Sequence, residues 1–201
     1  MAKLNIGSLL RLCLILFLAW NSFIPSVKSQ TVLANIIASD STFSPENNPY
    51  IISTDLTILK GATLTLLPGV ELLFEQGTGL ICKGNLIAKG TSDNKIKFLP
   101  KSQISTAGQW IGITMNNAAT TYSADSMYLS GSVFSECEIS SANFALTLDK
   151  NSSLLIEKVN IAQSSFAVNI LGSANNVIRN CTITDANYGI FLADGLSLIH
   201  I

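Results

Sequence analysis

Phe134–Leu148 reads FSECEISSANFALTL, Ile156–Ile170 reads IEKVNIAQSSFAVNI, and Ile178–Leu192 reads IRNCTITDANYGIFL. The three stretches align without gaps, and their equivalent residues are 22 positions apart. A fixed period of roughly 20 to 50 residues is typical of a solenoid, in which each repeat packs on its neighbours. This part of the chain is therefore predicted to be a stack of similar coils.

Apolar residues alternate with polar ones within each repeat, and a period of two predicts strands. Short strands in each repeat predict a β-helix. A polar turn is expected between the two strands of a repeat. The inward positions are Cys137, Ile139, Leu146 and Leu148, with the equivalents Val159, Ile161, Val168 and Ile170, and Cys181, Ile183, Ile190 and Leu192.

The amino-terminal half carries the same period less regularly. Ile58, Ala62 and Leu64 recur 22 positions later as Leu80, Gly84 and Leu86. Residues 100–130 are rich in Ser, Thr, Ala and Asn, so we expect a coil with longer loops there. At about 22 residues a turn, residues 50–195 are predicted to form six or seven coils. Further inward positions are predicted at Val70, Leu72, Phe74, Ile96 and Phe98.

The opening coils resemble those of secreted right-handed parallel β-helix proteins of the pectin-lyase-like superfamily. The later pattern from Cys181 to Ile190 is similar to the parallel β-helix repeat of that superfamily. The resemblance implies an all-β, single-stranded right-handed parallel β-helix over residues 50–195. It does not imply one activity, because the superfamily holds lyases, hydrolases, epimerases, adhesins and structural proteins. The matching motifs of the opening coils are PYII (49–52), DLTI (55–58), GATLTL (61–66), PGV (68–70) and GNLIAKGT (84–91).

Residues 1–29 are predicted to be a secretory signal peptide. They contain three basic residues, no acidic residue and an apolar run at 12–20, and small residues precede a cleavage point after Ser29. The run is short for a membrane span, which needs about 20 apolar residues. We therefore expect a secreted, periplasmic or cell-surface protein with no membrane segment after cleavage. Residues 30–49 are predicted to form an N-terminal cap or lead-in strand.

The composition limits the partners. Only 12% of the residues are charged and 48% are hydrophobic, whereas an ordinary soluble domain is about one quarter charged. Loss of the signal peptide removes three of 12 basic residues and none of 13 acidic residues, leaving a net charge of −4. This balance disfavours nucleic acid and anionic lipid as partners.

The last six residues, 196–201, read LSLIHI and are expected not to be native. They match one reading frame of a common sequencing adapter, and no capping element follows the last repeat. The alternative is a genuine apolar strand. His200 is the only histidine and lies in this segment, so we place no catalytic or metal-binding role on it.

Stacking of coils predicts columns of equivalent side chains. Strands lie about 4.8 Å apart, so a disulfide between Cys137 and Cys181, two coils apart, exceeds the roughly 7 Å limit for its Cα atoms. Three buried free thiols are predicted, the third being Cys82. The predicted columns are Cys137–Val159–Cys181, Ile139–Ile161–Ile183, Phe144–Phe166–Tyr188, and Asn143–Ser165–Asn187 at the turn.

Three residues are candidates for ligand contact: Trp110 as a solvent-side aromatic, Arg179 and Asp185. Packing is the alternative for Trp110, and an ion pair with Glu157 is the alternative for Arg179. Asp185 aligns with Gln163 and Ser141, so the repeats form no acidic column there. The aromatic column is either a platform for sugar stacking or, as the repeat register favours, packing.

Two sequons are present. Asn151 is expected in a turn where a glycan can be attached, whereas the sequon at Asn180 overlaps a predicted strand. A Glu136–Lys158 ion pair between coils is also expected.

The function hypotheses come from two classes. The first is a structural or binding scaffold that presents a long side face of Ser, Thr and Asn to polysaccharide or cell-surface glycan, or that serves as a stalk. The alternative is a fragment of a polysaccharide lyase, glycoside hydrolase or epimerase whose catalytic coils are missing. Lyases need clustered carboxylates with a base, and hydrolases need facing carboxylates. We identify no catalytic residue in the repeats, and we expect neither cofactor nor metal.

Overall fold

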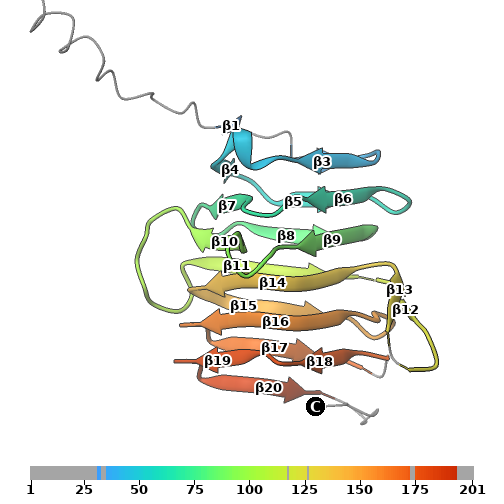
Figure 1. The fold of residues 1–201 in the computed structure, drawn as a ribbon. Coiled ribbons are helices and arrows are strands. Elements are labelled where there is room, and N and C mark those ends of the chain that lie inside the picture. Colours follow the sequence, from blue (N-terminus) through green and yellow to red (C-terminus); the bar gives the residue numbers. More distant parts are fainter. Residues whose placement is uncertain (1–30, 33–34, 117, 126, 173–174, 194–201) are drawn as a thin grey trace, which may run out of the picture.

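The computed structural model describes residues 31–32, 35–116, 118–125, 127–172 and 175–193. These residues form a parallel β-solenoid of about seven turns with coils about 22 residues apart, as the sequence predicts (Figure 1). The predicted signal peptide and the tail at 196–201 lie outside the described residues.

The strands of successive coils pair in register as three parallel ladders, which form three sides of the solenoid. The first ladder contains β1 (Thr31–Val32), β4 (Tyr50–Ile52), β7 (Glu71–Phe74), β10 (Ile96–Pro100), the second halves of β14 (Val133–Ser140) and β16 (Leu155–Ala162), and β19 (Thr182–Thr184). The second contains β2 (Ile36–Ile37), β5 (Leu56–Ile58), β8 (Gly79–Cys82), β11 (Trp110–Met115), β15 (Ala142–Leu148), β17 (Phe166–Ile170) and β20 (Tyr188–Leu192). The third contains β3 (Ser41–Phe43), β6 (Thr63–Leu66), β9 (Asn85–Lys89), the first halves of β14 and β16, and β18 (Val177–Arg179).

Single residues with left-handed backbone make the corners of the later coils. Glu136, Lys158 and Asn180 have φ between 51° and 55° and separate the third ladder from the first. A second column separates the first ladder from the second, with φ of 60° at Ser141, 53° at Gln163 and 52° at Asp185. Because both columns repeat every 22 residues, the bends stack as regularly as the strands do.

The polar turn is therefore shorter than predicted. Asn143 was expected in the turn, but it lies inside β15, which begins at Ala142. Asn187 and Ser165 directly precede β20 and β17. The predicted turn lies a few residues after the observed corner. The side-chain pattern does not show that one left-handed residue is enough to change the chain direction.

The inward columns form the core, as predicted, except in the last described coil, where the predicted inward residues Ile190 and Leu192 are 38% and 41% exposed. Cys137, Val159, Ile139 and Ile161 are at most 1% exposed, and Cys137 pairs with Val159 and Ile139 with Ile161. Ile183 pairs with Ile161 but is only partly buried, because it belongs to the last coil that the structure describes.

One prediction about the opening coils is corrected. In the segment 30–49, predicted as an N-terminal cap or lead-in strand, β1, β2 and β3 pair in register with β4, β5 and β6. Ile58 pairs with Cys82 and Leu80 pairs with Leu56, at an offset of 24 rather than 22. The turn after Ile58, with Gly61 at φ +87°, takes up the two additional residues, so that Leu64 still pairs with Leu86.

The longest departure from the repeat lies between β11 and β14. There, β12 (Thr121–Tyr122) and β13 (Tyr128–Ser130) pair antiparallel as a hairpin beside the solenoid (Figure 1). The Lys89 Nζ lies 4.1 Å from the ring centroid of Tyr128, a cation–π contact that holds the hairpin against the end of β9. A 3-10 turn at Pro45–Asn47 links β3 to β4.

All three cysteines of the described chain are free, but not all are buried as predicted. Cys82 and Cys137 are fully buried, and burial raises the pKa of each thiol from 9.0 to about 12. Cys181 is partly exposed, because it lies in the last described coil, and burial raises its pKa as well.

The left-handed corners can be tested at Gln163. We expect Gln163→Val to lower the free energy of unfolding by about 1–2 kcal/mol, because a β-branched residue is strained at φ 53°. Gln163→Gly should stay within about 1 kcal/mol of the parent, since glycine adopts this backbone readily. Asn160→Val, at an exposed strand position of β16, is the matched control, and denaturant unfolding is the measurement. Equal loss of stability in all three variants would contradict the assignment of the corner.

The thiols can be ranked by timed alkylation at pH 8. We expect Cys181 to be modified first, with Cys82 and Cys137 modified only on unfolding, because the thiolate is the reactive form. Peptide mass spectrometry after each time point gives the order. Modification of Cys137 as fast as Cys181 in the folded protein would show that the core column is wrong.

The raised pKa of the buried thiols also predicts alkaline destabilisation. Above pH 9.0 the unfolded thiols lose protons that the folded ones keep until about pH 12. The free energy of unfolding should therefore fall across this window by roughly 1.4 kcal/mol per pH unit for each thiol. Cys137→Ala provides the comparison, since its stability should fall less steeply over the same window.

Candidate functional site

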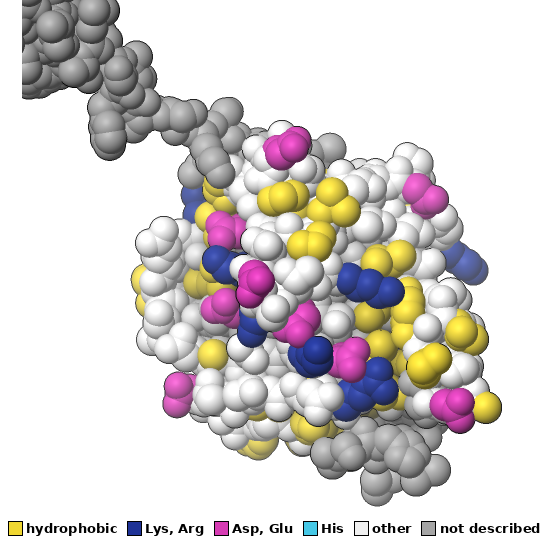
Figure 2. All heavy atoms as spheres, viewed as in Figure 1, with side chains coloured by type: hydrophobic (Ala, Val, Ile, Leu, Met, Phe, Trp, Pro, Cys, Tyr) yellow, Lys and Arg dark blue, Asp and Glu magenta, His cyan; other side chains and the backbone are white. Residues whose placement is uncertain are grey.

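The outward side of the first ladder, here called the first face, carries charges of alternating sign. Glu71, Lys97 and Glu138 occupy equivalent outward positions on β7, β10 and β14. The Lys97 Nζ lies 2.8 Å from the Glu71 Oε1. This hydrogen bond raises the pKa of Lys97, and the negative charges of Glu71 and Glu138 act in the same direction. Figure 2 shows acidic and basic side chains alternating in a band across this side of the molecule.

Ion pairs between neighbouring coils keep such charges balanced. The predicted Glu136–Lys158 ion pair is confirmed at 3.2 Å. For Arg179 the alternative of an ion pair is confirmed, because its Nε donates to Glu157 at 2.9 Å. Because these side chains are part-exposed, each pair contributes at most about 1 kcal/mol. The outward positions are thus more charged than the expected Ser, Thr and Asn. In each of the four pairs of the described residues the glutamate lies one coil before its cation, the remaining two being Glu71–Lys97 and Glu75–Lys101.

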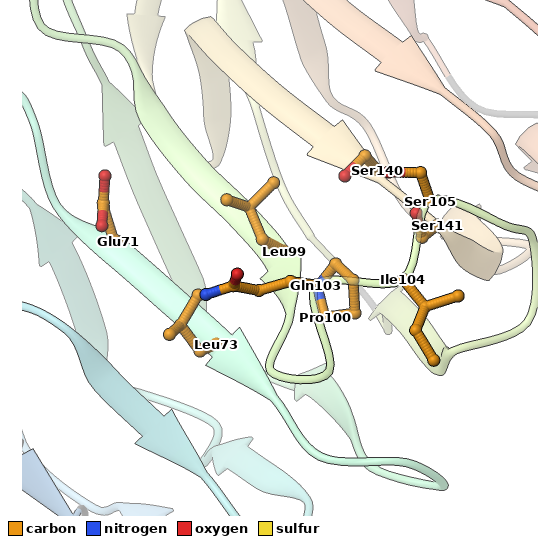
Figure 3. A pocket seen from close by; sticks show the side chains of 9 residues that line it. All are labelled: Glu71, Leu73, Leu99, Pro100, Gln103, Ile104, Ser105, Ser140 and Ser141. Carbon is orange, nitrogen blue, oxygen red and sulfur yellow. The ribbon is translucent and has the colours of Figure 1, made fainter.

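A cavity of about 320 Å³ opens on the first face where the loop at 101–109 leaves β10 (Figure 3). Outward residues of β7 and β10 form its floor, and the loop and the end of β14 complete its wall. Figure 3 shows Gln103 extending toward Leu73, while three serines gather away from Glu71. The lining residues are Glu71, Leu73, Leu99, Pro100, Gln103, Ile104, Ser105, Ser140 and Ser141.

The loop is held in place by hydrogen bonds at its end. The Gln109 backbone N–H donates to the Ser141 carbonyl at 2.8 Å, and its side-chain amide donates to the Thr106 hydroxyl at 2.9 Å. Gln103 has φ 56°, which turns the chain directly after β10. The wall of the cavity is therefore fixed to the corner at Ser141, although the loop has no strand of its own.

Trp110 supports this corner from below instead of facing solvent, so the expectation of a solvent-side aromatic is wrong. Its side chain is 1% exposed and stacks on Phe74, with ring centroids 4.1 Å apart. Its indole N–H donates to the Ser140 carbonyl at 2.8 Å. Stacking of the coils places Phe74 against the ring of Trp110. Core packing therefore accounts for the position of Trp110, whose buried ring is not accessible to a ligand.

The same argument applies to the aromatic column on the second ladder. Phe144, Phe166 and Tyr188 stack in the predicted register, with centroids 4.9 and 4.5 Å apart and planes within 17°. Both faces of Phe166 are therefore covered by its neighbours, and Phe191 meets it edge-on at 5.7 Å. Since a sugar stacks on a ring face, the geometry favours the packing alternative.

The three candidate ligand residues do not come together. Trp110 lies on β11, Arg179 on β18, and Asp185 at the exposed corner after β19. Asp185 has φ 52° and follows Gln163 in the corner column, so the backbone conformation accounts for its short polar side chain. Of the sequons, Asn151 is exposed in a turn as predicted. Asn180 is an exposed corner residue rather than a strand residue.

The cavity itself was not predicted from the sequence. One signal was present: Leu73 and Leu99 are apolar at outward positions whose neighbours are charged. The course of the loop, which brings Gln103 and Ser105 over them, is not repeated elsewhere in the chain and so leaves no pattern to align.

The described residues contain no group of three or more His, Cys, Asp or Glu side chains arranged to hold a metal ion. Among the helices of these residues, none is long and apolar enough to cross a membrane.

The comparisons with known proteins agree with the fold. The family described as right handed beta helix region matches residues 79–200, more than half of the chain. A stretch of 64 residues, 32% of this chain, is 34% identical to the protein named bark beetle of Drosophila melanogaster and spans only 2% of that protein's length. No solved structure matches. With the parallel ladders described above, the family match shows that this chain belongs to the right-handed β-helix family.

Proposed function

We propose that this chain is part of an extracellular β-helix scaffold that binds a polysaccharide or cell-surface glycan along its first face. The observation that carries the proposal is the cavity of about 320 Å³, whose floor is built by stacked residues of neighbouring coils. Small-ligand sites are concave and combine apolar walls with convergent polar groups. This cavity combines four apolar residues with five polar or charged ones.

The shape of the fold supports an extended ligand. Because neighbouring coils lie about 4.8 Å apart in a straight stack, the first face continues above and below the cavity. Its charges are paired between coils, so a glycan passing over it meets mostly neutral pairs and short polar side chains. A polymer can thus contact several coils while one of its units enters the cavity.

Binding fits the cavity better than hydrolysis does. Canonical glycoside hydrolysis uses two carboxyl groups on either side of the bond that breaks. Among the described residues that line the cavity, Glu71 supplies the one carboxylate, and it is paired with Lys97 at 2.8 Å. We therefore propose a scaffold that holds its glycan without cleaving it.

The proposal predicts that the purified chain binds at least one member of a panel of neutral and acidic polysaccharides. Glycan-array binding followed by titration calorimetry is the measurement. Asn143→Ala, on the second ladder, should bind as the parent does, because its side chain is exposed on another side of the solenoid. Absence of binding across the panel would reject the glycan-binding part of the proposal and favour a stalk.

A further prediction concerns export. Expressed with its own leader in a secretory host, the protein should appear outside the cytoplasm with Gln30 as its first residue. Amino-terminal sequencing of the exported protein gives the result. Retention of residues 1–29 in a membrane fraction would instead indicate an anchor.

A further inference from the structure

We propose that the cavity on the first face takes one uncharged pyranose ring and discriminates against uronic acids. This inference rests on the proposed glycan-binding function and adds the class of sugar that the site accepts. It is carried by three properties of the cavity: an apolar floor, free amide and hydroxyl groups, and a carboxylate that already holds the nearest cation.

The floor suits the C–H face of a sugar ring. Leu73 and Leu99 are directly paired on β7 and β10, so their side chains lie side by side on the outer surface. Ile104, which is 51% exposed, extends this apolar surface, and the buried Pro100 also borders the cavity. Covering these groups with a ligand removes apolar area from water, which favours binding.

The polar groups of the cavity suit hydroxyl ligands. Within the described residues, the side-chain amide of Gln103 and the hydroxyls of Ser105 and Ser140 make no hydrogen bond to the protein. An amide and a hydroxyl each donate and accept, as a sugar hydroxyl does. Figure 3 places Gln103 across the floor from the serines, so polar groups approach a bound ring from two sides.

The charges around the cavity disfavour an anion. Glu71 is the charged residue of the lining, and the neighbouring cation, Lys97, is already held by Glu71 and faces Glu138 on its other side. The next lysine on β10's end, Lys101, is paired with Glu75 at 2.7 Å. A sugar carboxylate would therefore have to share Lys97 with Glu71 and Glu138, whereas an uncharged ring needs no cation.

The volume limits the ligand to one unit. About 320 Å³ is at the lower end of the range for small-ligand pockets, roughly 300–1,000 Å³. One ring therefore occupies the cavity, while the remaining units of a glycan lie on the flat part of the first face.

The experiment compares neutral and uronic oligosaccharides of equal length for binding to the full chain by calorimetry. We expect at least about tenfold tighter binding of the neutral ligand. Equal or tighter binding of the uronic ligand would overturn the inference while leaving glycan binding intact. Absence of binding to both would reject the proposed function itself, so the two failures are distinguishable.

Two variants locate the binding in the cavity. Leu99→Trp fills the floor and should weaken binding of the neutral ligand by about tenfold or more, whereas Leu59→Trp adds the same bulk at an exposed turn away from the cavity and should not. Gln103→Gly removes the amide at a position where glycine accepts φ 56°, and it should cost about two- to tenfold in affinity. Unchanged binding in both cavity variants, with folding verified by circular dichroism, would place the ligand elsewhere.

A third variant should reverse the charge discrimination. Glu71→Gln removes the carboxylate and releases Lys97, so the ratio of uronic to neutral affinity should rise by several fold. A change in folding alone would alter both ligands together. Unaltered discrimination in this variant would contradict the electrostatic part of the inference.

Discussion

In-register hydrogen bonding between coils is the constraint on which the rest of this structure depends. Parallel strands pair at about 4.8 Å, so each paired strand residue of one coil lies directly against its equivalent in the next. Ile139, Ile161 and Ile183 must then share one inward column, and Glu136 and Lys158 must be neighbours on the outside. A sequence satisfies this constraint most simply by repeating itself at the length of one coil.

The corners show what the constraint costs. A left-handed residue other than glycine costs roughly 1–2 kcal/mol, yet six of them stand in two columns at the bends of the later coils. The strain is offset by the ladders on each side of the bend, whose strands run uninterrupted up to the corner. The bend also aims the following strand, because Ser141 directs the chain into β15, where Leu146 and Leu148 enter the core.

The sequence predicted the register wherever the repeat is free of gaps, because side-chain alternation and a fixed offset then determine every pairing from Phe134 onward. It failed where the coil length changes. Ile58 was matched to Leu80 because both are apolar, but the turn at Gly61 shifts its partner to Cys82. Trp110 was expected on the surface, since its burial depends on Phe74 in the coil above and on a loop that has no counterpart in other coils.

The candidate site follows from the same physics, at the place where the repeat is broken. In a regular coil the outward side chains form ion pairs and hydrogen bonds with those of the next coil, as Glu71 and Lys97 do. Such a surface has few free hydrogen-bonding groups left for a ligand. Between β10 and β11 the chain departs for the loop at 101–109 and returns to the corner at Ser141, which creates a wall above the flat sheet. Leu73 and Leu99 lie beneath that wall, at positions where neighbouring outward residues form charge pairs. Apolar area and polar groups of the loop therefore come together in this cavity. The paired strands β7 and β10 thus hold the floor of the site in a fixed position, and the loop at 101–109 makes the site concave.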